Sequence, residues 1–132
     1  EVSLPTGLDP HGLSRDPAVV QKYQNDPLVH GTATFSGALF MLGAVEFIFE
    51  HGAQFGPPLL LSHGTGDPIA YARGSQDFAA LAPHATLKLW DGLYHETHNE
   101  PEQQQVLAYL IDWLDAQLPV DRLKQPEGNT SP

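Results

Sequence analysis

Cysteine is absent from the 132 residues, and positive charge is scarce. Without cysteine the chain has no disulfide, no thiolate nucleophile and no Cys-based zinc site, which fits a reducing compartment. Six Lys and Arg residues stand against 16 Asp and Glu residues, so the formal net charge is −10. Phosphate binding requires the opposite sign, and we therefore expect no nucleic-acid partner.

Long hydrophobic runs are also missing. No stretch approaches the roughly 18 apolar residues that a membrane-spanning helix needs, and no signal peptide is visible. Because the chain begins with Glu1 rather than Met, the lack of a signal peptide does not fix a location. A cytoplasmic or peripheral-membrane location is the expectation. The apolar fraction of 41% allows one domain with a core.

The segment from Pro57 to His95 has the pattern of a strand, a helix and a second strand. Residues 59–61 are continuously apolar, which is typical of a strand buried on both faces. A helix is expected over 73–81 and a second strand over 85–90. Together they predict a βαβ unit with a right-handed crossover, which places the chain in the α/β class.

Asp67 and His95 come directly after the two expected strands. In open parallel sheets ligands bind beyond the carboxyl ends of the strands, so these side chains could meet there. A carboxylate that accepts the Nδ1–H of a histidine fixes its tautomer, and Nε2 then takes a proton from a nucleophile. We therefore predict Asp67 and His95 as catalytic residues. Taken singly, each has an ordinary alternative, as a turn residue and a structural histidine.

Two motifs near these residues resemble functional sites but are assigned no such role. His95 and His98 resemble a zinc motif, but they are three positions apart where that motif has four. The run His63-Gly64-Thr65-Gly66 resembles an oxyanion-hole motif, yet it leads straight into Asp67 and fits a turn at the end of a strand. We predict neither a metal nor an organic cofactor.

Helices are expected on both sides of the βαβ unit. The first begins with Ser14 as its cap and stops before Asp26-Pro27. The last begins with Asn99 as its cap, and its apolar residues recur at helical spacing, so that one face packs on the sheet. Residues 119–132 are polar and are expected to form a frayed tail, in which the glycosylation match at 129–131 is weak.

The helix expected over 36–51 is nearly apolar on all sides and is followed by Gly52 at the C′ position. One interpretation is a helix of the protein core. The other is a lid element whose apolar side chains face a lipid-like substrate. The residues assigned to substrate binding under the second interpretation are Leu39, Phe40, Met41, Phe47 and Ile48.

A serine nucleophile is the component that these candidates lack. No Gly-x-Ser-x-Gly occurs in the sequence, and no serine lies at an expected sharp turn from a strand into a helix. Ser62 falls within a strand and Ser75 at the start of a helix, while Ser14 and Ser36 are expected to cap helices. An acid and a base without a nucleophile form an incomplete site.

Several motifs stand in a characteristic order along the chain. They are Leu13-Ser14-Arg15-Asp16-Pro17, Tyr23, Asp26-Pro27-Leu28-Val29, Leu59-Leu60-Leu61-Ser62-His63-Gly64-Thr65-Gly66-Asp67, and Gly92-Leu93-Tyr94-His95-Glu96 with Asn99-Glu100-Pro101-Glu102. Together they resemble the C-terminal half of the monoacylglycerol lipase family, whose members are serine hydrolases with the α/β-hydrolase fold. The match runs from about Leu13 to Leu118.

The resemblance implies an α/β fold: the C-terminal part of an α/β-hydrolase, with its last two parallel strands, flanking helices and part of a helical cap. It divides the chain into part of the cap (1–55), part of the core (56–118) and a flexible tail (119–132). It also implies Asp67 as the acid and His95 as the base of a Ser-Asp-His triad. The serine should then lie upstream of this chain, and no metal or cofactor is required.

The implied activity is hydrolysis of monoacylglycerols or related lipid esters through an acyl-enzyme intermediate. The expected partners are a small lipid ester and the missing N-terminal part of the same fold, and the cap could also touch a membrane surface. Because two parallel strands leave sheet edges open, we expect a longer fold. Because the chain lacks the nucleophile elbow, we expect it to be inactive on its own. A non-catalytic binding or scaffold protein, or another enzyme of this fold, stays open as an alternative.

Overall fold

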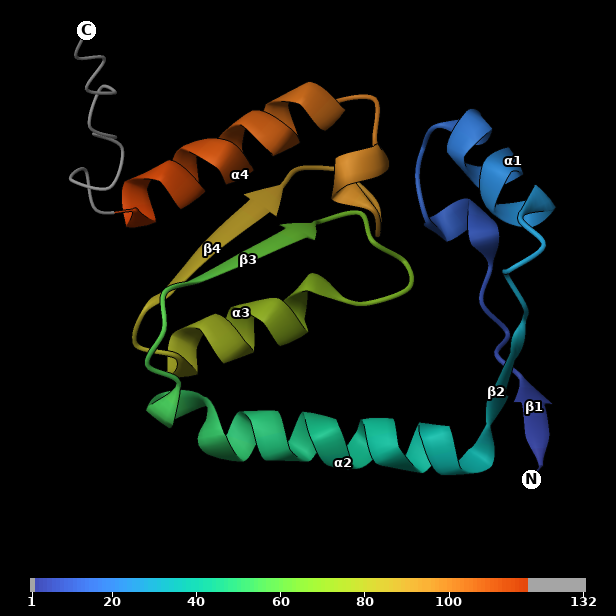
Figure 1. The fold of residues 1–132 in the computed structure, drawn as a ribbon, viewed down its shortest axis with the longest axis horizontal. Coiled ribbons are helices and arrows are strands. Elements are labelled where there is room, and N and C mark those ends of the chain that lie inside the picture. The colour runs from blue at the N-terminus through green and yellow to red at the C-terminus, as the bar shows by residue number, and fades with distance from the viewer. Residues whose placement is uncertain (1, 119–132) are drawn as a thin grey trace, which may run out of the picture.

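The computed structural model describes residues 2–118, and a parallel βαβ unit lies at its centre (Figure 1). Strand β3 (Leu59–Gly64) leads through helix α3 (Ala72–Leu81) into strand β4 (Ala85–Trp90). The strands pair in parallel, with β3 and β4 in register from their first residues to their last. The predicted unit is confirmed, and β3 continues beyond the predicted apolar run as far as Gly64.

Helices cover the two faces of this sheet, with α3 on one side and α4 (Gln103–Gln117) on the other (Figure 1). The indole N–H of Trp113 donates to the Thr86 hydroxyl across 3.2 Å. The rings of Trp90 and Tyr109 meet edge to face, with centroids 5.8 Å apart. These contacts place Tyr109 and Trp113 of α4 against β4, so the predicted packing of α4 on the sheet is confirmed. The predicted apolar stripe is wrong in part, because only Val106 of it is buried, and its other members are exposed: Leu107, Leu110, Ile111 and Leu114.

The residues of the fully buried core are few. Within residues 2–118 the buried apolar side chains are Leu13, Val20, Ala82, Leu93 and Val106. Residues 59–61 are half-buried, so the prediction of a strand buried on both faces is wrong for this structure. The reason is that β3 has a single neighbouring strand in the part of the chain described, and its other edge is unpaired.

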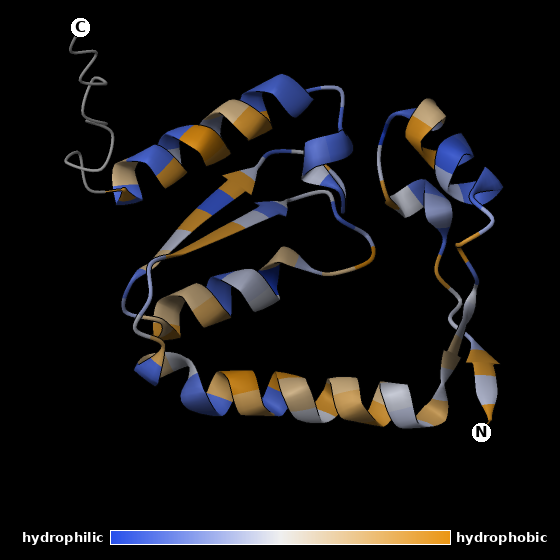
Figure 2. Cartoon of the chain, in the orientation of Figure 1, coloured by the Kyte–Doolittle hydropathy of each residue, from blue (hydrophilic) through white to orange (hydrophobic). Residues whose placement is uncertain are grey.

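Helix α2 (Phe35–His51) is the most exposed apolar element, and Figure 2 shows hydrophobic residues all along it. None of its residues is buried, and Phe40 is 77% exposed. The interpretation as a core helix is therefore wrong for the described residues. Thr34 caps the helix, since its hydroxyl accepts the Gly37 N–H, so the prediction of Ser36 as the cap is also wrong.

Helix α2 ends differently from the prediction. Gly52 has a right-handed φ of −56°, and the chain continues into a 3₁₀ turn (Gly52–Gln54) instead of leaving through a left-handed glycine. Space is tight at Gly52, because a Cβ would lie 3.0 Å from the Phe78 ring, which would have to shift by a few tenths of an ångström. The ring of Phe49 also meets Phe78 edge to face, so the end of α2 rests on α3.

The N-terminal segment contains two short strands that the sequence did not reveal. Strands β1 (Ser3–Pro5) and β2 (Thr32–Thr34) pair antiparallel and enclose a 3₁₀ turn (Pro10–Gly12) and helix α1 (Pro17–Asn25). From its mixture of Pro, Gly and Asp with few apolar residues, the segment over 1–10 is predicted to be irregular, and strand β1 shows that this prediction is wrong for residues 3–5.

The ends of the outer helices correct two predicted caps. Asp16, rather than Ser14, caps α1, since its carboxylate accepts the Ala18 N–H across 2.8 Å. After a 3₁₀ turn (Thr97–Asn99), α4 begins with Glu102 in the cap position, so Asn99 does not cap it. The Asn99 amide instead donates to Glu96.

No helix within residues 2–118 has the length and apolar character to cross a bilayer. The tail predicted over 119–132, with its glycosylation match, lies outside the described residues.

Candidate active site

Asp67 stands in the turn that follows β3, and its carboxylate is held by the turn itself. Oδ1 accepts the backbone N–H groups of Ile69 and Ala70 across 2.8 and 3.0 Å. The side chain is 2% exposed. Such short side-chain-to-backbone bonds are the reason that aspartate suits this turn position. The second oxygen, Oδ2, is left to contact side chains from elsewhere.

His95 lies in the loop after β4 and meets that second oxygen. Its Nδ1 is 2.8 Å from Asp67 Oδ2, which confirms the predicted meeting of the two side chains. Because an ionised carboxylate only accepts hydrogen bonds, Nδ1 carries the proton and Nε2 is left as the basic nitrogen. The His95 side chain is 38% exposed, so this ring is open to a further group.

Glycines allow the two loops to approach. A Cβ on Gly64 would lie 2.1 Å from the Leu93 carbonyl oxygen, so only glycine fits at the end of β3. Gly92 has a φ of +72°, a left-handed conformation that glycine adopts without strain and that turns the chain after β4. Both features bring the Asp67 turn against the segment that leads to His95.

The environment of Asp67 favours its ionised form. Burial raises the pKa of this carboxyl, but the hydrogen bonds that it accepts from Ala70, His95 and Ile69 more than offset burial. The pKa of Asp67 therefore lies below its ordinary value of 3.8. At neutral pH Asp67 is therefore a carboxylate, which accepts the Nδ1–H of His95.

A second histidine, His63, also contacts Asp67, and sequence reasoning assigned it only to a turn. Its Nε2 lies 2.7 Å from the Ala70 carbonyl and 3.2 Å from Asp67 Oδ2. Since a carbonyl only accepts, Nε2 carries the proton, and Nδ1 accepts the Ser75 hydroxyl across 2.8 Å. The only sign of this contact in the sequence is that His63 is a polar residue close to the end of the apolar run over 59–61.

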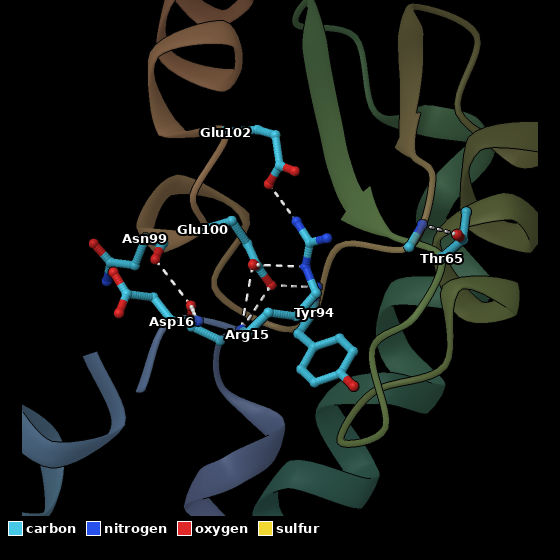
Figure 3. Close-up of polar contacts among 9 residues, drawn as sticks. Arg15, Asp16, Thr65, Tyr94, Asn99, Glu100 and Glu102 are labelled. Atoms are coloured by element: carbon cyan, nitrogen blue, oxygen red, sulfur yellow. Dashed lines mark hydrogen bonds and ion pairs between the residues drawn. The ribbon is translucent and has the colours of Figure 1, made fainter. Parts of the chain in front are cut away.

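The loop after His95 is tied to the segment before α1 (Figure 3). The Ser14 hydroxyl donates to the Asn99 carbonyl, and the Arg15 guanidinium contacts the carboxylates of Glu100 and Glu102. Partial burial lowers the pKa of Arg15, but the hydrogen bonds and charges of these two glutamates outweigh it and raise the pKa above its ordinary value. These residues lie in motifs of the sequence, but no local pattern predicts that they pair.

The residues predicted to bind substrate all lie on α2 and are exposed, away from the Asp67–His95 pair. They are Leu39, Phe40, Met41, Phe47 and Ile48. Phe47 and Ile48 line an open apolar cavity of about 560 Å³ between α2, β3 and α3, whose lining includes Leu61 and Phe78. Asp67 and His95 do not line it. The structure therefore brings the acid and base together, but does not bring these five residues to them.

Among residues 2–118 there is no group of three His, Cys, Asp or Glu side chains that could hold a metal ion. The His98 side chain is exposed, and the ring of His95 faces Asp67.

Comparison with known proteins decides which family this geometry belongs to. The sequence profile described as serine aminopeptidase, S33, a hydrolase family, matches residues 1–102. The chain belongs to this family. Solved structures agree: the crystal structure of a monoacylglycerol lipase from Paleococcus ferrophilus superposes with a TM-score of 0.83 at 30% identity, over 87% of this chain and 46% of that one. The predicted α/β-hydrolase fold is confirmed.

Relatives of the S33 chain include lipases from distant organisms. A monoacylglycerol lipase of Mycolicibacterium smegmatis is 38% identical over 84% of this chain and 41% of its own length. An uncharacterized abhydrolase domain-containing protein of Dictyostelium discoideum is 34% identical over 96% of this chain and 14% of its own length. The resemblance to monoacylglycerol lipases is confirmed, and the chain spans less than half of each of these relatives.

Proposed function

We propose that this S33 chain supplies the acid and the base of a serine hydrolase that cleaves monoacylglycerols or related lipid esters. The observation that carries the proposal is the 2.8 Å contact between His95 Nδ1 and Asp67 Oδ2 at the carboxyl ends of two parallel strands. The substrate class is supported by relatives named as monoacylglycerol lipases. No metal or organic cofactor takes part in the proposed reaction.

The pair has the arrangement that acyl transfer requires. Nε2 of His95 takes the proton of a serine hydroxyl as its oxygen attacks the ester carbonyl. Asp67 stabilises the imidazolium that forms, because its carboxylate is ionised and faces Nδ1–H. His95 then returns the proton to the departing glycerol oxygen, which leaves an acyl-serine. Water activated by the same Nε2 hydrolyses this acyl-enzyme.

The nucleophile of the proposed triad comes from outside these 132 residues. No Gly-x-Ser-x-Gly occurs in the sequence. The Ser14, Ser62 and Ser75 hydroxyls are bonded to the Asn99 carbonyl, the Trp90 indole and His63 respectively. Their hydroxyls are therefore engaged away from the base.

The chain also divides as the resemblance implies. We assign residues 1–55 to part of the cap and 56–118 to part of the hydrolase core. Exposure of the apolar α2 side chains supports a cap whose Leu39, Phe40, Met41, Phe47 and Ile48 face lipid, either substrate or a membrane surface. The unpaired edge of β3 supports pairing with the remainder of the fold.

Substitution of the pair tests the proposal in the polypeptide that carries both this chain and the nucleophile. With a monoacylglycerol substrate, Asp67→Asn and His95→Ala should each lower kcat roughly 10³- to 10⁵-fold. His84→Ala is the matched control, because His84 is exposed next to the start of β4, at the opposite end of the sheet from His95. Near-normal turnover in both pair variants would contradict the assignment of the pair, whereas a lack of turnover in the unaltered protein would favour a binding or scaffold role.

Two further measurements test the finer points. A fluorophosphonate probe should label a serine of the complete protein that lies outside residues 1–132, and should not label this chain alone. A substrate panel separates the reaction classes: monoacylglycerols should be cleaved faster than short acyl esters, and faster than an aminoacyl amide. Preference for the amide would contradict the lipid assignment.

A further inference from the structure

Glu100 is a charged side chain with no exposed surface in the loop that follows His95. Its carboxylate lies between Arg15 and Tyr94, as Figure 3 shows. It accepts the Arg15 Nε–H across 2.9 Å and the Tyr94 backbone N–H across 2.7 Å. The backbone N–H of Arg15 lies 3.3 Å from both carboxylate oxygens. Burial of a carboxylate costs free energy unless hydrogen bonds and an opposite charge compensate it, and Glu100 has both.

These contacts hold the backbone on both sides of the candidate base. Tyr94 immediately precedes His95, and its N–H is bound by Glu100. The N–H groups of His95 and Glu96 donate to the carbonyls of the segment before α1, at Gly12 and Leu13, across 3.4 and 2.8 Å. Consecutive amides of the His95 loop are thus bound by groups outside β4.

The two halves of the candidate pair are positioned in different ways. Asp67 is held by amides of its own turn, at Ile69 and Ala70. The segment around His95 has no regular structure. Its amides are bound by the Glu100 carboxylate, which Arg15 holds, and by the carbonyls of Gly12 and Leu13. The place of the imidazole therefore depends on Arg15 and Glu100 in a way that the place of the carboxylate does not.

We propose that Glu100, locked by Arg15, is a positioning residue that fixes the Tyr94–His95 backbone so that the imidazole meets Asp67. This inference rests on the proposed function of His95 as the base. Glu100 touches no reacting atom; it acts through the Tyr94 amide. The same ion pair joins the segment before α1 to the base, so a shift of that segment moves the ring. A displacement of about 1 Å at a catalytic group can cost about 10²-fold in rate.

Kinetics in the complete protein provide the first test. Glu100→Gln keeps the shape of the side chain but removes its charge, and one of its amide hydrogens then faces the Arg15 donor. We expect kcat to fall about 10²-fold, with KM for a soluble ester within about twofold because Glu100 touches no substrate. Asp77→Asn is the matched control, since it removes a carboxylate from the exposed ion pair with Arg73.

Nuclear magnetic resonance of the same variants separates positioning from general stability. The hydrogen-bonded Nδ1–H proton of His95 gives a signal well downfield, and it should shift or broaden in folded Glu100→Gln and stay unchanged in Asp77→Asn. If Glu100→Gln does not fold, Arg15→Lys serves instead, because it keeps the charge and loses the Nε donor; it should show the same loss of kcat and the same spectral change.

The outcomes are distinct. A folded Glu100→Gln or Arg15→Lys protein with kcat within twofold of wild type and an unchanged His95 signal would overturn the inference. Failure of the proposed function has another signature: His95→Ala would retain turnover, while Glu100→Gln would still alter the His95 signal.

Discussion

Replacement of Asp67 by asparagine should inactivate the S33 protein by imposing the wrong tautomer on His95. Asp67 accepts three hydrogen bonds, two from backbone amides at Oδ1 and one from the Nδ1–H of His95 at Oδ2, and His63 Nε2 lies 3.2 Å from Oδ2. In Asp67→Asn the amide oxygen can keep the bonds to Ile69 and Ala70, but its NH₂ group then faces the Nδ1–H of His95. Two donors cannot bond, so the His95 proton moves to Nε2, which can no longer accept the proton of a serine.

The magnitude follows from this loss of the base. A wrong tautomer in a Ser-His-Asp triad lowers kcat by about 10⁴-fold, which corresponds to about 5.4 kcal/mol at about 1.36 kcal/mol for each factor of ten. Loss of a charge-assisted hydrogen bond should lower the free energy of unfolding by a smaller amount, about 1.5–3 kcal/mol. The catalytic loss thus exceeds anything that partial unfolding of the variant would cause.

Turnover and the state of the His95 ring should be measured on the same Asp67→Asn protein. Monoacylglycerol hydrolysis gives kcat, and the ¹⁵N shifts of the imidazole report which nitrogen is protonated. Asp77→Asn, in an exposed ion pair, controls for loss of an aspartate charge. The reasoning is refuted if Asp67→Asn keeps kcat within tenfold of wild type, or loses activity while His95 still carries its proton on Nδ1.

Three further predictions concern the scaffold of the pair. Gly64→Ala should lower the free energy of unfolding, measured in urea, by several kcal/mol, because its Cβ would lie 2.1 Å from the Leu93 carbonyl oxygen. Gly74→Ala is the control: a Cβ there lies in open space within α3, so it should raise the free energy of unfolding by about 0.4–1 kcal/mol. His63→Ala removes two neutral hydrogen bonds and should cost about 1–3 kcal/mol, and Ser75→Ala about half as much. Because the pKa of Asp67 is lowered, its contribution to stability is fully present above its ordinary value of 3.8 and is lost as pH falls through the lowered pKa; acid titration of unfolding should show this loss in wild type and not in Asp67→Asn.

The sequence predicted the part of the fold that follows from local patterns. The Pro and Gly residues on each side of the apolar run, and the strand, helix and strand pattern that follows, predicted β3, α3 and β4. The polar loop after each strand pointed to Asp67 and His95. Parallel pairing then brought those two residues to one edge of the sheet, which required no knowledge of distant contacts.

Features that depend on distant contacts were missed. The Arg15–Glu100 pair joins positions 85 residues apart, so no local pattern in the sequence predicts it. Asn99 looked like a helix cap, but its carbonyl accepts the Ser14 hydroxyl and its amide donates to Glu96, and α4 begins after Pro101. An all-round apolar helix such as α2 carries no signal that separates a core position from an exposed one.

The central claim is that Asp67 and His95 act as one catalytic unit, and the Asp67→Asn/His95→Ala double variant tests it most directly. Members of a triad are strongly non-additive, because removal of one disables the others. In the polypeptide that carries the nucleophile, kcat of the double variant for a monoacylglycerol should equal that of His95→Ala alone. Turnover close to wild type in His95→Ala, or losses in the double variant that multiply those of the single variants, would contradict the account.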